Sequence, residues 1–158
     1  MKKNSGFSVI ELMVVVAIFA ILASIAVPGF LDWRSRSRLQ GAVSNLVADF
    51  QLAKMRAVKE NSNVAIEFIA PDYTSYRVYV DNNPGNGAFD AGEILLRNVE
   101  FPNGLSYDPT QSGFAGGVHR TNFDSRGLPN GLGGTATLRQ DAQLRKIVVN
   151  RVGRIRTE

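Results

Sequence analysis

The sequence contains no cysteine and a single histidine, His119. Without cysteine, disulfide frameworks, zinc–thiolate sites and cysteine nucleophiles are excluded. One histidine gives poor support to a histidine-built metal site or to a serine–histidine catalytic relay. Phosphate-binding loops of the Walker or dinucleotide type are also missing from the sequence. We therefore expect no cofactor and no enzymatic activity.

Charge is missing from residues 12–27, where Ser24 is the one polar side chain. Two lysines precede this run, so the positive-inside rule places the N-terminus in the cytoplasm and leaves the rest of the chain exported. As a helix, residues 7–27 would span about 31 Å, which is enough to cross a membrane. The alternative is an ordinary secretory signal, cleaved after the apolar run near Ala26. We predict a transmembrane helix over residues 7–27.

Glu11 lies inside this apolar stretch, where a carboxylate is costly and points to a function. Cleavage after Gly6 would create an N-terminal amine at Phe7, one helical turn before Glu11. Within one chain the amine and the carboxylate stand at i and i+4. Between neighbouring chains, a slide of about one turn would bring the carboxylate of one subunit to the amine of another. Glu11 is therefore a candidate assembly residue.

The N-terminal segment resembles the type IV pilin family, which includes type II secretion pseudopilins, in Lys3, residues 6–15 (GFSVIELMVV) and residues 26–28 (AVP). The resemblance implies that a prepilin peptidase cuts between Gly6 and Phe7 and methylates Phe7, and that Glu11 sets the register during assembly. Its implied partners are other pilins or pseudopilins, the peptidase and an inner-membrane assembly platform. It also implies a single-pass inner-membrane protein with a periplasmic globular domain, which later enters a pilus or pseudopilus.

The remaining chain predicts one long helix followed by short strands. Pro28-Gly29 predicts a kink or a melted turn, after which the helix resumes. An apolar stripe at helical spacing then comprises Leu39, Val43, Leu46, Val47, Phe50 and Ala53. The charged side chains that lie mostly off this stripe are Arg34, Arg36, Arg38, Lys54 and Lys59, and the arginines are expected to form a solvated face just outside the membrane.

Short β-prone runs separated by turn residues cover 64–69, 76–80, 94–99, 105–107, 121–123, 135–138, 146–150 and 154–156, and Ser112-Gly113 marks a loop. We predict an α+β fold, in which the long N-terminal helix packs its second half on an antiparallel β-sheet domain. Its parts are a leader at residues 1–6, the transmembrane helix at 7–27, an amphipathic continuation at 28–60 and a β-rich domain at 61–158.

The later chain resembles the GspH/FimT group of minor pseudopilins and minor pilins in residues 122–127 (NFDSRG), 136–138 (ATL), 145–150 (RKIVVN) and 153–156 (GRIR). This resemblance implies a minor subunit that primes or caps a type IV pilus or a type II secretion pseudopilus. A major pilin remains an alternative. In FimT-like minor pilins a Gly-Arg-x-Arg motif is associated with binding double-stranded DNA during natural transformation, and residues 153–156 match that motif.

Net charge is +4, but it is unevenly distributed: residues 139–158 carry six basic and two acidic side chains, and residues 60–138 carry four basic and nine acidic ones. On a strand, Arg154 and Arg156 would point to the same face, where two guanidinium groups suit phosphate oxygens. The candidate DNA-binding residues are Lys146, Arg151, Gly153, Arg154 and Arg156. The alternatives are a basic edge strand that discourages aggregation, or salt bridges to the acidic middle of the chain.

Residues 81–93 form an acidic, glycine-rich stretch. Asp81, Asn83 and Asp90 offer oxygen ligands that suit calcium. The spacing of an EF-hand fails, because Gly85 stands where a third oxygen ligand should be and Gly92 stands where the closing glutamate should be. A plain loop between strands is therefore the preferred interpretation, and calcium binding is the alternative.

Overall fold

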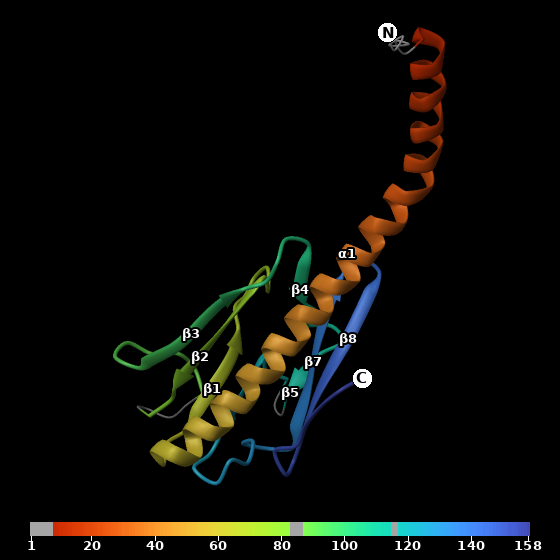
Figure 1. The fold of residues 1–158 in the computed structure, drawn as a ribbon. Coiled ribbons are helices and arrows are strands. Elements are labelled where there is room, and N and C mark those ends of the chain that lie inside the picture. The colour runs from red at the N-terminus through yellow and green to blue at the C-terminus, as the bar shows by residue number, and fades with distance from the viewer. Residues whose placement is uncertain (1–7, 83–86, 115–116) are drawn as a thin grey trace. The chain divides into compact units, whose positions relative to one another are not determined.

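A computed structural model describes residues 8–82, 87–114 and 117–158, with Pro28 described by its backbone alone (Figure 1). It divides into two compact units, residues up to Ser37 and Arg38–Glu158. The units share one helix, α1 (Val9–Glu60). Helical structure continues through residues 28 and 29, so the predicted melted turn does not occur there.

The first unit is helical and has its apolar side chains exposed. α1 contains an 18-residue window with a mean hydropathy of 2.8, none of which is buried. By length and composition this helix could cross a membrane. The sequence-based prediction of a membrane-spanning segment is therefore compatible with the helix that the structure has.

The second unit contains two antiparallel sheets. The first has the order β3-β2-β1-β6, with β1 (Val64–Phe68), β2 (Ser75–Val80), β3 (Ile94–Glu100) and β6 (Arg120–Phe123). The second has the order β4-β7-β8-β9, with β5 also paired to β7. Its strands are β4 (Leu105–Tyr107), β5 (Gly113–Phe114), β7 (Gly133–Gln140), β8 (Gln143–Asn150) and β9 (Ile155–Thr157).

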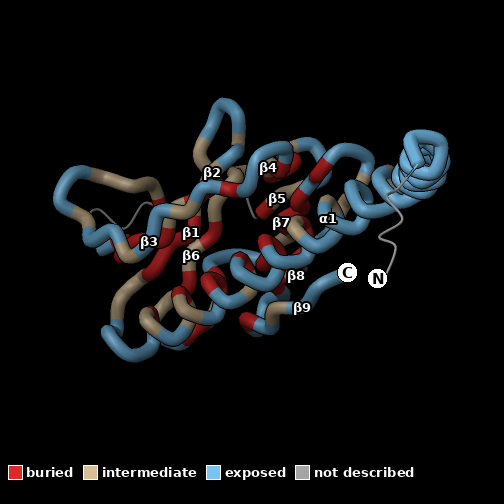
Figure 2. The backbone as a smooth tube through the Cα atoms, turned by 45° about the horizontal axis from the view of Figure 1, so that its top comes forward, coloured by how far each residue is buried: buried red, intermediate tan, exposed pale blue. Residues whose placement is uncertain are grey.

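The second half of α1 lies across both sheets, with the β1–β3 side to its left and β7–β8 to its right in Figure 1. Its apolar stripe is buried as predicted, apart from Val47, which is half-buried. Figure 2 shows buried segments recurring along the second half of α1. The α+β fold is thus confirmed. The β domain contains two sheets, and β5 forms where a loop was expected.

A buried polar network fastens α1 to the first sheet. Asp49 is 1% exposed on the helix. It accepts a hydrogen bond from the Tyr76 hydroxyl at 2.6 Å and forms an ion pair with Arg97 of β3. Burial and the hydrogen bond to Asp49 raise the pKa of Tyr76 well above its usual range. The tyrosine therefore stays a donor, and the carboxylate is satisfied without water.

Candidate assembly and nucleic-acid interfaces

The first candidate site is the start of α1. Glu11 lies exposed in the first helical turn. Negative charge is favoured there, because the unpaired amide groups of a helix N-terminus carry partial positive charge. Gly6 and Phe7, the predicted cleavage pair, lie outside the described residues. The structure thus places this carboxylate in the first turn of α1, and its role in assembly stays a prediction.

The side chains that follow Glu11 form a continuous exposed apolar surface. Their exposed fractions range from 39% for Val15 to 72% for Ile25. A soluble monomer rarely exposes a contiguous apolar area of this kind, so it marks a contact with lipid or with other protein. Glu11 is the one ionisable group within this surface from Val9 to Leu31.

The second candidate site is the C-terminal strand β9, an edge of the second sheet. Ile155 pairs with Val149, and both lie on the core side of the sheet. Arg156 pairs with Val148 and therefore points to the opposite, solvent face. Arg154 precedes it by two residues and Lys146 precedes Val148 by two, so both share this face. The sequence prediction that Arg154 and Arg156 lie on one face agrees with this register.

Gly153 has a structural role that the motif alone did not reveal. Its φ is +69°, and a Cβ added there would lie 2.5 Å from the Gly127 carbonyl oxygen. The Lys54 ammonium group donates a hydrogen bond to the Gly153 carbonyl oxygen at 3.0 Å. Lys54 therefore joins α1 to the turn before β9, and this turn also meets the loop that contains Gly127.

The basic side chains of this region are only partly neutralised. Arg156 pairs with the exposed Glu158 at 2.8 Å, and Arg139 approaches Asp108 at 3.8 Å. Within the parts of the chain that the structure describes, no ion pair involves Lys146, Arg151 or Arg154. The alternative interpretation is that salt bridges to the acidic residues 60–138 neutralise these basic side chains. Among the described ion pairs, it holds for Arg139 alone.

The third candidate site is the stretch that was considered for calcium. Asp81 is fully buried just after β2, and its Oδ2 accepts a hydrogen bond from the Gly87 amide at 2.8 Å. Asp90 is half-buried, and Asn83 lies outside the described residues. Over residues 8–82, 87–114 and 117–158, no three His, Cys, Asp or Glu side chains form a ready-made metal centre. Because Asn83 lies outside the described residues, the predicted set of Asp81, Asn83 and Asp90 stays a prediction.

Comparisons with known proteins agree with this architecture. Residues 42–153 match the sequence model of the type II transport protein GspH family, and residues 1–27 match that of the prokaryotic N-terminal methylation motif. The pilin-like protein PilA1 of Thermus thermophilus is 28% identical over 158 residues, covering 97% of each chain. A fimbrial protein of Pseudomonas aeruginosa is 38% identical over 78 residues, which is 49% of each chain.

Two solved structures share the fold. The type IV minor pilin FimU of Pseudomonas aeruginosa has a TM-score of 0.59 at 21% identity, covering 80% of this chain and 92% of that one. The minor pseudopilin EpsH of the Vibrio cholerae type 2 secretion system has a TM-score of 0.57 at 12% identity, covering 77% and 96%.

A long helix whose first part is apolar, and whose second half packs on antiparallel sheets, is the fold that this chain shares with these pilin-like proteins. Because the family model covers most of the sequence, the chain belongs to the GspH family of type IV pilin-like proteins.

Proposed function

We propose that this chain is a minor pilin or pseudopilin subunit that primes or caps a type IV pilus or a type II secretion pseudopilus. A prepilin peptidase cleaves it between Gly6 and Phe7 and methylates Phe7. Membership of the GspH family and the methylation motif over residues 1–27 support this proposal. The observation that carries it is Glu11, a lone carboxylate in the first turn of an otherwise apolar and exposed helix.

Assembly then follows from the surroundings of this helix. Before assembly, residues 7–27 span the inner membrane, with the N-terminus cytoplasmic and the β domain periplasmic. The apolar surface passes from lipid to neighbouring subunit helices without entering water, so little hydrophobic free energy is lost. Glu11 pairs with the terminal amine of an adjacent subunit, because a carboxylate in apolar surroundings needs an opposite charge. An inner-membrane assembly platform is the partner at which this transfer takes place.

The test is Glu11→Ala, compared with Ser24→Ala as a control in the same helix. Glu11→Ala should leave the protein in the membrane fraction and remove it from sheared filaments, whereas Ser24→Ala should retain both properties. Normal incorporation of Glu11→Ala would refute the role of Glu11. Separately, substitution of Gly6 should leave the leader attached in intact-protein mass spectra.

A second function, binding of double-stranded DNA, is favoured by one arrangement. Lys146, Arg154 and Arg156 share the solvent face of β8 and β9, and the first two have no acidic partner among the described ion pairs. Such a face would contact phosphates without reading the base sequence, and its affinity would fall steeply with salt. DNA uptake is the process that this activity would serve.

A salt series of DNA binding by the full chain in detergent tests this second function. Arg154→Ala/Arg156→Ala should weaken binding, with a log–log salt slope shallower by about 0.9 for each lost phosphate contact. Arg34→Ala/Arg36→Ala removes the same charge from the first unit and should leave the slope unchanged. Equal losses in the two double variants would indicate a nonspecific effect of net charge. Absence of binding at low salt would leave the basic strand as a structural feature.

A further inference from the structure

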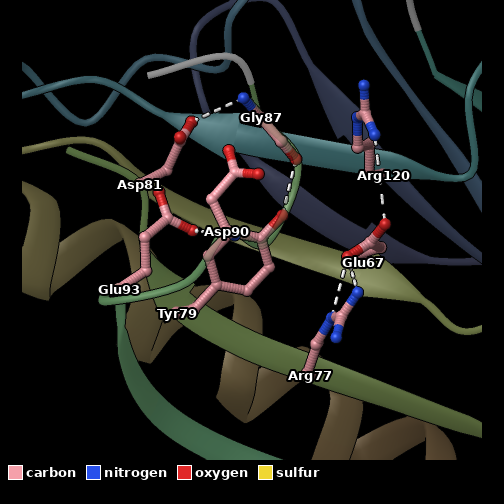
Figure 3. Close-up of polar contacts among 8 residues, drawn as sticks. All are labelled: Glu67, Arg77, Tyr79, Asp81, Gly87, Asp90, Glu93 and Arg120. Atoms are coloured by element: carbon pink, nitrogen blue, oxygen red, sulfur yellow. Dashed lines mark hydrogen bonds and ion pairs between the residues drawn. The ribbon is translucent and has the colours of Figure 1, made fainter. Parts of the chain in front are cut away.

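The loop between β2 and β3 contains two buried carboxylate oxygens without a donor. Asp81 is 0% exposed, and its Oδ1 has no hydrogen-bond partner. The Oε1 atom of the half-buried Glu93 is also enclosed and without a partner. The two basic side chains drawn nearby, Arg77 and Arg120, instead point to Glu67 (Figure 3). Buried acceptors are nearly always satisfied, so this pair calls for a partner.

The carboxyl groups of Asp81 and Glu93 lie near each other in this loop (Figure 3). Two adjacent carboxylates repel each other unless a proton or a cation lies between them. Figure 3 shows Asp81, Asp90 and Glu93 around the same part of the loop.

Hydrogen bonds to the backbone hold these groups around Gly87. Gly87 has a φ of +77°, and its amide donates to Asp81 Oδ2 at 2.8 Å. The Tyr79 hydroxyl donates to the Gly87 carbonyl oxygen at 2.5 Å and holds the turn in place. The Asp90 amide donates to Glu93 Oε2 at 2.9 Å. The acidic side chains are thus fixed around a glycine turn rather than spread along a solvated loop.

The spacing of the acidic residues agrees with that of an EF-hand loop when positions are counted from Gly87. In an EF-hand loop the invariant glycine is at position 6, followed by ligand positions 9 and 12, the last of which is a glutamate that binds through both oxygens. Asp90 stands three residues after Gly87, and Glu93 stands six residues after it. Asp81 stands six residues before Gly87 instead of five. One extra residue before the glycine therefore explains why a count from Asp81 failed.

We propose that this loop is a calcium site, in which Asp81 and Glu93 bind the ion and Asp90 contributes directly or through water. Calcium accepts six to eight oxygen ligands in flexible geometry, so carbonyl oxygens and water complete the shell. Magnesium requires a tighter octahedron and is the poorer fit. The site fixes β2 to β3, the edge of the first sheet, and calcium therefore stabilises that edge.

The test uses the full chain in detergent after dialysis against EGTA, with calorimetric titration of CaCl₂ and thermal unfolding followed by circular dichroism. One ion should bind per chain with a Kd on the order of 10⁻⁴–10⁻³ M, the range of extracellular calcium modules. The Tm should rise with calcium as expected for a ligand that binds only the folded state. MgCl₂ should have a smaller effect.

Glu93→Gln should weaken calcium binding by more than about a hundredfold, because loss of a group outside the coordination sphere already costs about 10–100-fold. Glu100→Gln, the same change at an exposed carboxylate of β3, should bind like the unaltered chain. Should Glu93→Gln fold poorly in EGTA, Asp90→Asn provides the second variant, and it should also weaken binding.

Two results would overturn the proposal. One is an unaltered chain that shows neither binding heat nor a Tm change up to about 10 mM CaCl₂, well above the expected Kd. The other is equal calcium affinity in Glu93→Gln, Asp90→Asn and Glu100→Gln.

Discussion

The two halves of α1 differ in what covers them. From Arg38 onward, the apolar stripe is buried by two sheets within the same chain, and Leu46, Phe50 and Ala53 are fully enclosed. Before Ser37, the large apolar side chains that the structure describes are exposed. Both halves are helical over their described length, so helix formation does not depend on this covering.

This one helix is therefore adapted to two different surroundings along its length. The second half is amphipathic because the sheets occupy one side and water occupies the other. The first half is apolar around its whole circumference, as expected of a helix enclosed by lipid or by other helices. The second unit is therefore self-sufficient, and the first requires partners outside this chain.

Paired phenylalanine substitutions should separate the two halves most strongly. Phe50 is 0% exposed and lies 6.4 Å, between ring centroids, from both Phe114 and Phe123. Phe50→Ala should destabilise the second unit by about 3–5 kcal/mol, because the cavity adds to the lost burial. Phe19→Ala, at a residue 66% exposed, should leave urea unfolding of the β domain unchanged. A similar loss of stability in both variants would contradict the division into two units.

Paired glycine substitutions test the same contrast in the backbone. Gly153→Ala should cost about 3 kcal/mol, since a left-handed residue with a Cβ costs about 1–2 kcal/mol and the clash with the Gly127 carbonyl adds about 1–3 kcal/mol. Gly29→Ala has nothing within 4 Å of the new Cβ and should favour the helix slightly. Thermal unfolding of both variants measures the difference. Equal Tm values would show that the turn at Gly153 is not packed as described.

Much of this architecture follows from local patterns in the sequence. The apolar stripe of α1 repeats at helical spacing, and the β-branched runs around Val64, Val78 and Val148 predict strands. The pairing of the strands does not follow, because which edges join depends on contacts between distant residues. β5 contains only two residues and has too little sequence to show a period.

The candidate sites also combine features that a local sequence pattern predicts with features that depend on distant residues. The common face of Arg154 and Arg156 depends only on the strand period, so it could be predicted. The contact of Lys54 with Gly153 joins residues 99 positions apart and could not. The position of Asp49 in the helix gives no sign of Tyr76 and Arg97, which are supplied by other elements.

A smaller loss of stability is expected when the buried Asp49 carboxylate of the second unit loses one hydrogen bond. Tyr76→Phe removes the donor to Asp49 but leaves Arg97 in place. It should therefore cost about 1–3 kcal/mol, the penalty for a buried acceptor that loses one hydrogen bond. Ser24→Ala, which removes an exposed hydrogen bond to the Ile21 carbonyl oxygen in the first unit, should leave the β domain unaffected. Urea unfolding compares the two variants. If Tyr76→Phe lost no more stability than a typical surface substitution, the hydrogen bond to Asp49 would not contribute as described.

The smallest expected effects concern pH, and they have opposite signs at two aspartates of the second unit. A hydrogen bond from the Thr110 hydroxyl is the first cause that lowers the pKa of Asp108 below its ordinary value of 3.8. The stability that Asp108 contributes is thus present above pH 3.8 and is lost as pH falls through the lower, folded-state pKa. Asp108→Asn should flatten the acid limb of a stability–pH curve.

Asp81 behaves in the reverse sense, because burial raises its pKa above 3.8. Its folded form holds a proton more tightly than the unfolded chain, so the associated stability is present below pH 3.8 and is lost as pH rises through the folded-state pKa. In EGTA, Asp81→Asn should therefore remove a decline of stability on the alkaline side of 3.8, where Asp108→Asn has no such effect. Urea unfolding at a series of pH values measures both slopes. Slopes of the same sign would mean that the carboxyl group of Asp81 is not enclosed, because only an enclosed carboxyl group beside Glu93 would favour the protonated form.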